Sequence, residues 1–202
     1  MQKNFFNRKN INDYWRNINK KIFFNFLFLF FLGIFFSFSS TSSLAGERLN
    51  KDFYFFFTKH LIFTLLALFI MILISVIKTE LLIKLVVPFF ILSFILLALV
   101  PIIGIEVKGA KRWLDFYFFR LQPIEILKPL FILTTVKILT LEKFKNSQIK
   151  YVLSFTLLSS IIILLIDQPD LGQTILLIGS WTATVFVYGV SLVYILIFFA
   201  IF

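Results

Sequence analysis

Five basic residues lie close together between two long apolar runs, and we call them the basic stretch: Lys108, Lys111, Arg112, Arg120 and Lys128. Arg112 and Arg120 are two of only five arginines among the 20 basic residues of the chain. The planar guanidinium group binds phosphate through two parallel hydrogen bonds, which the ammonium group of lysine does not. The pattern therefore predicts a site for an anion, such as the phosphate or diphosphate group of a lipid.

Carboxylates near the basic stretch leave a structural alternative open. Glu106 and Asp115 are close enough in sequence to pair with its charges in a solvated loop. Glu125 lies three residues before Lys128, near the start of an expected membrane helix. Ionisable groups in such a helix are costly and usually face a partner or a wet cavity. At this spacing the two side chains can pair with each other, or they can contact a substrate.

Three other residues are interpreted from their positions at expected membrane or helix boundaries. Trp113, beside Arg112, is expected to anchor the loop at the depth of the lipid headgroups. Asp170 follows a short polar turn and is expected to cap the next helix by accepting backbone N–H groups. His60 lies at a helix entrance and is interpreted as a boundary residue rather than a catalyst.

The apolar runs around these residues are too long for a water-soluble fold. Hydrophobic residues make up 60% of the chain and charged residues 15%, against about 25% charged residues in soluble domains. A helix needs about 20 apolar residues to cross roughly 30 Å of hydrocarbon. We therefore expect an all-α polytopic membrane bundle of six complete helices and a truncated seventh. The expected ranges are 22–41, 61–77, 85–105, 123–141, 151–166 and 171–190, with a partial helix at 192–202.

Proline positions refine these expected helices. Pro88 and Pro101 fall near the ends of the third helix, where a missing backbone donor costs least. Pro123 is expected in the first turn of the fourth helix, and Pro129 is expected to kink it. The run 192–202 would span only about 16 Å as a helix. We therefore expect a chain that stops within its seventh helix, as an amino-terminal fragment would.

The amino-terminal residues 1–21 are polar and basic and are expected in the cytoplasm, ahead of a membrane domain at 22–202. This orientation places twelve Lys and Arg residues on the inner side and eight on the outer side. The alternative is a cleaved signal peptide, because Ser43-Leu44-Ala45 resembles a cleavage site. The basic residues that give the chain its net charge of +10 flank apolar spans, and this distribution argues against nucleic-acid binding.

The sequence contains few residues that could support metal binding or redox chemistry. The chain has no cysteine and one histidine, so neither a disulfide nor a thiolate metal site is possible and zinc is not expected. No cofactor is evident, and a requirement for a divalent cation is left open.

Three segments resemble signatures of the SEDS family, the FtsW/RodA/SpoVE group of bacterial cell-wall polymerases. Gly109 to Trp113 reads G-A-K-R-W, Gln122 to Pro129 reads Q-P-I-E-I-L-K-P, and Gln168 to Gly172 reads Q-P-D-L-G. We call these the first, second and third signature segments. The stretch 47–55 also resembles the first outer loop of the FtsW branch, which favours division over elongation.

The chain departs from the family pattern in two places. Ile124 stands where the family has Ser or Thr, which removes one hydroxyl. The resemblance also covers only the first six of about ten membrane helices and part of the seventh. It implies a catalytic aspartate in an outer loop after helix seven, which this chain does not reach. No residue here is therefore assigned a catalytic role, and the chain alone is expected to be inactive.

The resemblance implies a peptidoglycan glycosyltransferase of the bacterial inner membrane that uses lipid II as donor and acceptor. It also implies a class B penicillin-binding protein as partner. A lipid II flippase and a non-catalytic membrane partner of the division machinery remain alternatives. The implied substrate-binding residues are Lys111, Arg112, Trp113, Arg120, Gln122, Glu125 and Lys128. The implied structural positions are Gly109, Pro123, Gln168, Pro169, Asp170 and Gly172.

Overall fold

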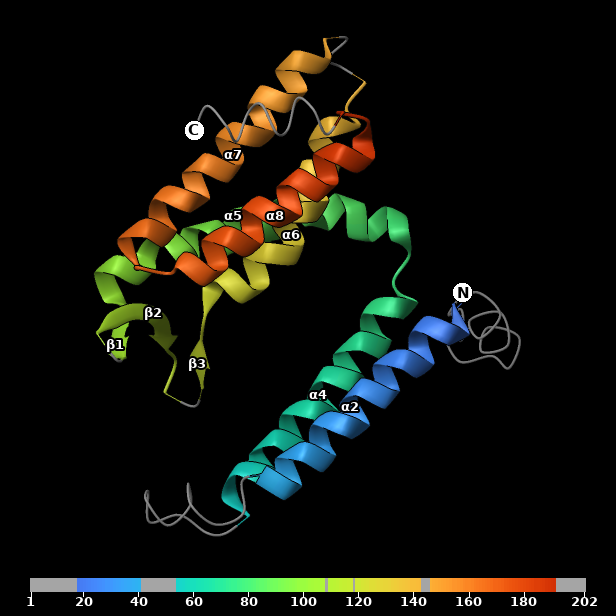
Figure 1. Ribbon diagram of the computed structural model, residues 1–202, viewed down its shortest axis with the longest axis vertical. Helices are drawn as coiled ribbons and strands as arrows, with labels where there is room; N and C mark the ends of the chain where they lie inside the picture. Colours follow the sequence, from blue (N-terminus) through green and yellow to red (C-terminus); the bar gives the residue numbers. More distant parts are fainter. Residues whose placement is uncertain (1–17, 41–53, 108, 118, 143–145, 192–202) are drawn as a thin grey trace, which may run out of the picture. The chain divides into compact units, whose positions relative to one another are not determined.

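The computed structural model describes residues 18–40, 54–107, 109–117, 119–142 and 146–191, which form six helices and three short strands. The chain divides into two compact units (Figure 1), unit 1 at Met1–Lys78 and unit 2 at Thr79–Phe202. The expected partial helix at 192–202, most of the basic amino terminus and Lys108 lie outside the described residues.

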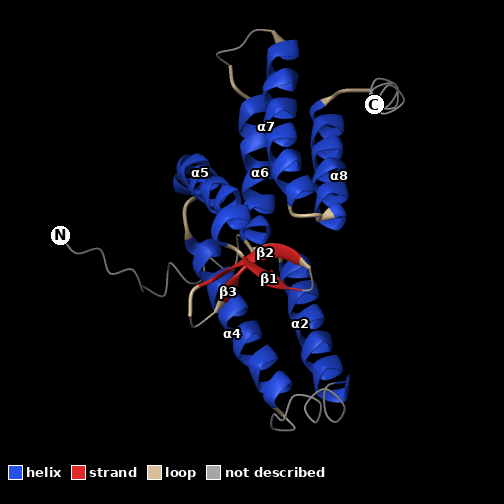
Figure 2. Ribbon diagram, turned by 90° about the vertical axis from the view of Figure 1, so that its left-hand side faces the viewer, coloured by secondary structure: helices blue, strands red, loops and turns tan. Residues whose placement is uncertain are grey.

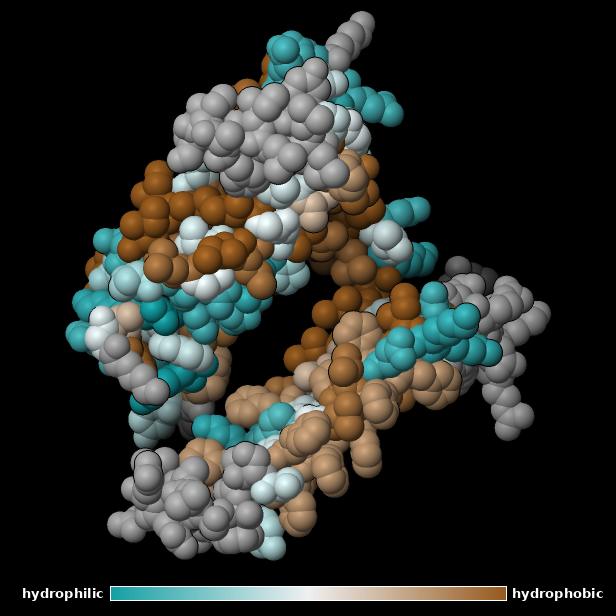
Figure 3. Space-filling view, viewed as in Figure 1, coloured by the Kyte–Doolittle hydropathy of each residue, from teal (hydrophilic) through white to brown (hydrophobic). Residues whose placement is uncertain are grey.

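Unit 1 is a pair of helices, α2 (Lys20–Ser40) and α4 (Phe55–Val76), that lie side by side. Gly33 of α2 leaves room for His60 of α4, since a Cβ atom at Gly33 would lie 3.6 Å from the imidazole Nε2 atom. The rings of Phe38 and Phe57 pack edge to face 5.3 Å apart. Most other side chains of the pair point outward, and Figure 3 shows hydrophobic colours over much of its visible surface. An apolar exterior is what a helix pair in lipid requires.

Unit 2 packs four helices around one apolar core: α5 (Thr79–Ile103), α6 (Pro123–Leu139), α7 (Ser147–Asp167) and α8 (Leu171–Tyr188). Figure 2 shows α6, α7 and α8 running alongside one another. The fully buried core residues include Leu97, Leu127, Phe131, Ile161, Leu165 and Leu177. The buried indole N–H of Trp181 donates to the hydroxyl of Ser154 at 3.2 Å, so this polar group is satisfied inside the core.

A small antiparallel sheet joins α5 to α6, where the sequence analysis expected a loop. Its strands are β1 (Ile105–Val107), β2 (Ala110–Asp115) and β3 (Arg120–Leu121), in the order β1-β2-β3. Leu114 of β2 is only 3% exposed, so the sheet is anchored by an apolar side chain. The strands are too short for an alternation of apolar and polar residues to be recognised in the sequence. The many charged residues of this segment made the β pattern harder still to identify.

Two helices begin six residues before the expected positions. α4 begins at Phe55 rather than residue 61, and α5 begins at Thr79 rather than residue 85. Hydropathy marks where a helix enters hydrocarbon, but the helix itself continues through polar turns beyond that boundary. Glu80 in the first turn of α5 favours the earlier start because it faces the positive end of the helix dipole. Pro88 therefore lies well inside α5 rather than near its end, which corrects the expectation for this residue.

The other expected helix bounds differ from the structure by at most four residues. Among the described residues, five helices are long and apolar enough to cross a membrane: α2, α4, α5, α7 and α8. α6 has 17 residues and carries Glu125, Lys128 and Lys137. The polytopic helical fold is confirmed, whereas the count of six complete crossings is not.

Candidate functional site

The first signature segment begins in a tight turn between β1 and β2. Val107 pairs with Ala110 across the two strands, so the chain reverses direction between these two residues. Gly109 has a φ of +80°, a conformation that a side chain would strain. The glycine therefore lets the chain reverse at the carboxyl end of α5 and direct β2 back across the end of unit 2.

Arg112 of β2 reaches the third signature segment, 56 residues further along the chain. Its Nε atom donates to the carbonyl oxygen of Gln168 at 3.2 Å, and its Nη2 atom donates to that of Pro169 at 2.6 Å. Nε also lies 3.6 Å from the Oδ2 atom of Asp170. The guanidinium group predicted to bind phosphate thus fastens β2 to the turn between α7 and α8.

Asp170 uses its two carboxylate oxygens for different tasks. Oδ1 accepts a hydrogen bond from the backbone N–H of Gln173 at 3.4 Å, so Asp170 is the N-cap of α8, as its position predicted. Oδ2 faces Arg112. Gln168, at the other side of the same turn, donates from its buried side-chain amide to the carbonyl oxygen of Leu97 in α5 at 3.3 Å. The turn between α7 and α8 is therefore held by hydrogen bonds to β2, to α5 and to the first turn of α8.

Three side chains of α6 and α8 form a closed polar triangle. The Lys128 ammonium group pairs with Glu125 at 2.8 Å and donates to the side-chain oxygen of Gln173 at 2.8 Å. Gln173 in turn donates to Glu125 at 3.0 Å. The pairing of Glu125 with Lys128, one of the two possibilities that their spacing left open, is present, and Gln173 joins this start of α6 to the start of α8.

Gln173 is the residue that the sequence analysis missed. It follows directly after the third signature segment and lies three residues beyond Asp170, so it shares the first turn of α8 with its cap. Spacing alone was a weak signal, because the partner of Gln173 lies on another helix 45 residues away.

The two remaining described cations of the basic stretch behave differently. Arg120 pairs with Asp115 across β2 and β3 at 3.5 Å, which is the loop pairing that the structural alternative proposed. Lys111 donates to the carbonyl oxygen of Pro101 in the last turn of α5 at 3.5 Å. Among the described residues, Lys111 is the member of the basic stretch without a carboxylate ion pair.

The local charge is balanced rather than strongly positive. Against the five members of the basic stretch, the segments 105–128 and 167–170 contain five carboxylates: Glu106, Asp115, Glu125, Asp167 and Asp170. An incoming anion would therefore meet three described cations of the basic stretch, Arg112, Arg120 and Lys128, that are already paired with carboxylates. Among the described residues, Lys111 is the cation best able to donate to a phosphate oxygen without first losing a carboxylate partner.

The other predicted residues lie at the same end of unit 2. Trp113 is half-buried on β2 opposite Ile105 of β1. Gln122 is the N-cap of α6 without a side-chain capping bond, and Pro123 opens that helix as predicted. Gly172 is the second residue of α8, where a Cβ atom would lie 4.0 Å from Asp170. The three signature segments thus meet around the sheet, with no group of three metal-ligating side chains among the described residues.

The chain matches an established protein family over nearly its whole length. Residues 19–202 match the FtsW/RodA/SpoVE family, described as cell cycle proteins. A probable peptidoglycan glycosyltransferase FtsW of Wigglesworthia glossinidia brevipalpis is 31% identical, over 85% of this chain and 47% of that protein. A protein with the same description from Caulobacter vibrioides is 34% identical, over 82% of this chain and 42% of that protein. The chain thus spans about half, or less, of the length of these relatives.

Two solved structures share the fold at 26% sequence identity. One is a crystal structure of a mutant of the Thermus thermophilus rod shape determining protein RodA, with a TM-score of 0.70. That match covers 85% of this chain and 55% of RodA. The other belongs to work on polymerization and crosslinking by a peptidoglycan synthase complex, with a TM-score of 0.72. It covers 88% of this chain and 51% of the matched chain.

Proposed function

The chain belongs to the FtsW/RodA/SpoVE family of cell cycle proteins, and from this premise we propose that it is the amino-terminal part of a peptidoglycan glycosyltransferase. Its curated relatives are named as probable peptidoglycan glycosyltransferases. The proposed substrate is lipid II, which would serve as both donor and acceptor. Division rather than elongation is the proposed setting, since these relatives are named FtsW.

One observation carries the proposal: Arg112 joins the first signature segment to the third. The two segments lie in separate helix connections, and its bonds to Gln168 and Pro169 bring them to one place. The triangle of Glu125, Lys128 and Gln173 brings the second segment to the same end of unit 2. A site assembled from three distant segments is typical of substrate positioning on a rigid scaffold.

The residues have different roles in the proposed reaction. A sugar hydroxyl of the acceptor attacks the anomeric carbon of the donor and gives its proton to a carboxylate base, which the family resemblance places in a loop outside these 202 residues. The bond from that carbon to the lipid diphosphate breaks, so the diphosphate leaves with increasing negative charge. A cation near this diphosphate would stabilise the transition state. Lys111 is proposed for that contact because its ammonium group has no carboxylate partner among the described residues. Arg112 and Lys128 are positioning residues, since each is already paired.

The proposed location is the bacterial cytoplasmic membrane, with the amino terminus in the cytoplasm. Six basic residues in the first 21 support this orientation, because Lys and Arg near a first span are retained inside. It places the sheet and the signature segments at the outer surface, where the saccharide and diphosphate of lipid II would be available.

The proposed partner is a class B penicillin-binding protein. The matched chain from the peptidoglycan synthase study supports this proposal, since that work concerns polymerization and crosslinking together. An enzyme that extends glycan strands needs a second activity to crosslink them, and a membrane partner would supply that activity beside the outer face of unit 2.

Charge placement favours surface chemistry over translocation of the lipid. A flippase would use ionisable residues near the bilayer midplane. In unit 2, α8 carries no charged residue between Leu171 and Tyr188. α7 carries charges only near its two ends, at Lys150 and Asp167. If the chain instead has a non-catalytic role in the division machinery, substitutions in the signature segments should not change the rate of polymerisation. The chimera experiment described next therefore tests this alternative as well.

The test is a chimera in which residues 19–202 of this chain replace the matching segment of a full-length FtsW relative. With its synthase partner, the chimera is expected to polymerise lipid II. We expect Lys111→Ala to reduce turnover at least tenfold, because it removes a contact that strengthens in the transition state. Arg112→Ala and Lys128→Ala should also reduce turnover at least tenfold, because they release the positioned segments. Lys84→Gln is the control, because this exposed lysine of α5 lies at the end of unit 2 opposite the signature segments. Wild-type rates in all three site variants would overturn the proposal.

A further inference from the structure

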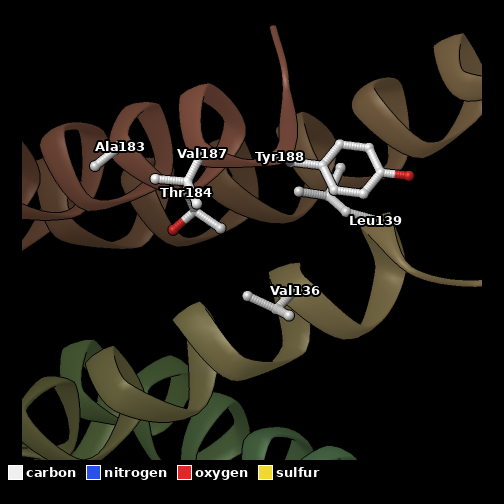
Figure 4. Close-up of a pocket in the computed structure, with 6 residues that line it drawn as sticks. All are labelled: Val136, Leu139, Ala183, Thr184, Val187 and Tyr188. Atoms are coloured by element: carbon white, nitrogen blue, oxygen red, sulfur yellow. The ribbon is translucent and has the colours of Figure 1, made fainter.

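An apolar groove lies between α6 and α8 in unit 2. Its volume is about 410 Å³, within the roughly 300–1,000 Å³ range of small-molecule sites. Figure 4 shows Val136 of α6 facing Thr184 and Val187 of α8, with Ala183 toward one end of the groove and Tyr188 and Leu139 at the other. Val187 is 83% exposed, so no other described residue covers this side of the groove.

The groove lies near the end of unit 2 that is opposite the sheet. α6 ends at Leu139, α7 begins at Ser147 and α8 ends at Tyr188, so three helix termini meet here. The start of α5 is at the same end, because the Lys137 ammonium group donates to the carbonyl oxygen of Ile83 at 3.1 Å. This groove is therefore separate from the site built by the signature segments.

A cation lies next to Tyr188, at one end of the groove. The Lys150 ammonium group donates to the hydroxyl oxygen of Tyr188 at 3.4 Å. Tyr188 lines the groove, and its ring packs against Tyr151 with the centroids 6.1 Å apart. No carboxylate among the described residues pairs with Lys150. Among the described residues, the hydrogen-bond partner of the ammonium group is thus a hydroxyl rather than a carboxylate, so an anionic ligand would not have to displace a carboxylate.

The apolar groove and the cation beside it together match an amphipathic molecule that has an apolar chain and an anionic headgroup. An apolar trough open to the bilayer fits an acyl chain, and a cation at a helix terminus fits an anionic headgroup. Basic pockets between membrane helices on the cytoplasmic side bind anionic lipid headgroups. A neutral or zwitterionic headgroup would gain less from Lys150, because its net charge is zero.

We propose that the groove between α6 and α8 is a binding site for an anionic phospholipid such as phosphatidylglycerol. One acyl chain lies against Val136, Ala183 and Val187, and the headgroup phosphate pairs with Lys150 and accepts a hydrogen bond from Tyr188. The lipid fills the groove between α6 and α8 and thereby holds together the helix ends farthest from the signature segments. The site does not depend on glycosyl transfer. Only its assignment to the cytoplasmic leaflet rests on the proposed orientation.

The first test is native mass spectrometry of the purified 202-residue chain in detergent. Dioleoylphosphatidylglycerol and dioleoylphosphatidylethanolamine are added at equal concentration. We expect the chain to retain phosphatidylglycerol preferentially and Lys150→Gln to weaken its binding about fivefold. Ala183→Leu, which fills the exposed groove, should weaken binding of both lipids. Lys84→Gln is the matched control, since this exposed lysine of α5 is at the same end but does not line the groove.

Equal retention of the two lipids, or an equal loss in Lys150→Gln and Lys84→Gln, would overturn the proposal. A second test identifies what occupies the groove. Benzoylphenylalanine in place of Val187 is photo-activated in vesicles containing phosphatidylglycerol, and the expected product is a lipid adduct of this chain. A crosslink to the apolar residues 192–202 instead would show that the chain itself covers the groove. Neither readout depends on lipid II, so failure here leaves the glycosyltransferase proposal untouched.

Discussion

The Nη2 atom of Arg112 donates a hydrogen bond to the carbonyl oxygen of Pro169 at 2.6 Å, across 57 residues of sequence. The neighbouring Nε atom donates to Gln168 and faces the carboxylate of Asp170. A single side chain of β2 therefore satisfies two carbonyls of a turn that also starts α8. This relationship makes the sheet and the turn between α7 and α8 one structural element rather than two independent loops.

Replacing Arg112 should loosen this element. A lysine cannot bond two adjacent carbonyl oxygens in the fork geometry of a guanidinium group. Hydrogen bonds to charged groups contribute about 1.5–3 kcal/mol each, and solvent screening reduces that value for a side chain that is 36% exposed. We expect Arg112→Lys and Arg112→Ala each to lower the free energy of unfolding by about 1–2 kcal/mol, measured by chemical denaturation in detergent. Arg120→Ala should cost less than half as much, and an equal cost would contradict this role for Arg112.

The triangle of Glu125, Lys128 and Gln173 should show energetic coupling between α6 and α8. Lys128 is 17% exposed, so its bonds are partly shielded from water. A double-mutant cycle of Lys128→Met and Gln173→Leu is expected to give a coupling energy of about 0.5–3 kcal/mol. The control cycle pairs Lys128→Met with Lys84→Gln, which lies at the far end of unit 2. Additive effects in both cycles would show that the triangle does not link the helices.

The two glycines Gly109 and Gly179 should respond oppositely to alanine. Gly109 has a φ of +80°, so a Cβ atom there costs about 1–2 kcal/mol although no neighbour obstructs it. Gly179 lies inside α8 with open space around it, so alanine should stabilise that helix by about 0.5–1 kcal/mol. Thermal unfolding of both variants in the same detergent measures the difference. A stabilising Gly109→Ala would mean that the turn between β1 and β2 adopts another conformation.

The sequence predicted the helices because each one is long enough for composition to identify it. Pro123 and Asp170 were also predicted correctly, since an N1 proline and an N-cap are local signals within one turn. The Glu125 and Lys128 pair was predictable for the same reason, because three residues on a helix place two side chains on one face.

The tertiary contacts of the site were not predictable from spacing. Arg112 was expected to bind an anion, and nothing in the sequence indicates that backbone carbonyls 56 residues away would accept its hydrogen bonds. The contacts of Gln173 were missed for a similar reason. Gln173 is an uncharged amide in an apolar helix, so no charge pattern in the sequence indicates its partners. The sheet was missed because strands of two to six residues give too few alternations to read.

Labelling of single cysteines should place the two ends of unit 2 on opposite sides of the membrane. The chain has no cysteine, so each introduced thiol is unique. In intact cells, Lys111→Cys should react with a membrane-impermeant maleimide, whereas Ser147→Cys should react only after permeabilisation. Ser147 opens α7 and Lys111 lies on β2, at opposite ends of unit 2. The reverse pattern would invert the topology and remove Lys111 from the face proposed to meet the saccharide of lipid II.

Substitutions of Asp170 should separate its capping role from its charge. Oδ1 caps α8 through the N–H of Gln173, while Oδ2 faces Arg112 at 3.6 Å. Asparagine keeps an oxygen acceptor for the cap but loses the charge, and alanine loses both. Because loss of an N-cap costs about 0.5–2 kcal/mol, we expect Asp170→Ala to be clearly less stable than Asp170→Asn. Hydrogen exchange of the Gln173 amide should increase in Asp170→Ala and remain near wild type in Asp170→Asn. If both variants lose protection equally, the charge facing Arg112 holds the start of α8, and the hydrogen bond of the cap is secondary.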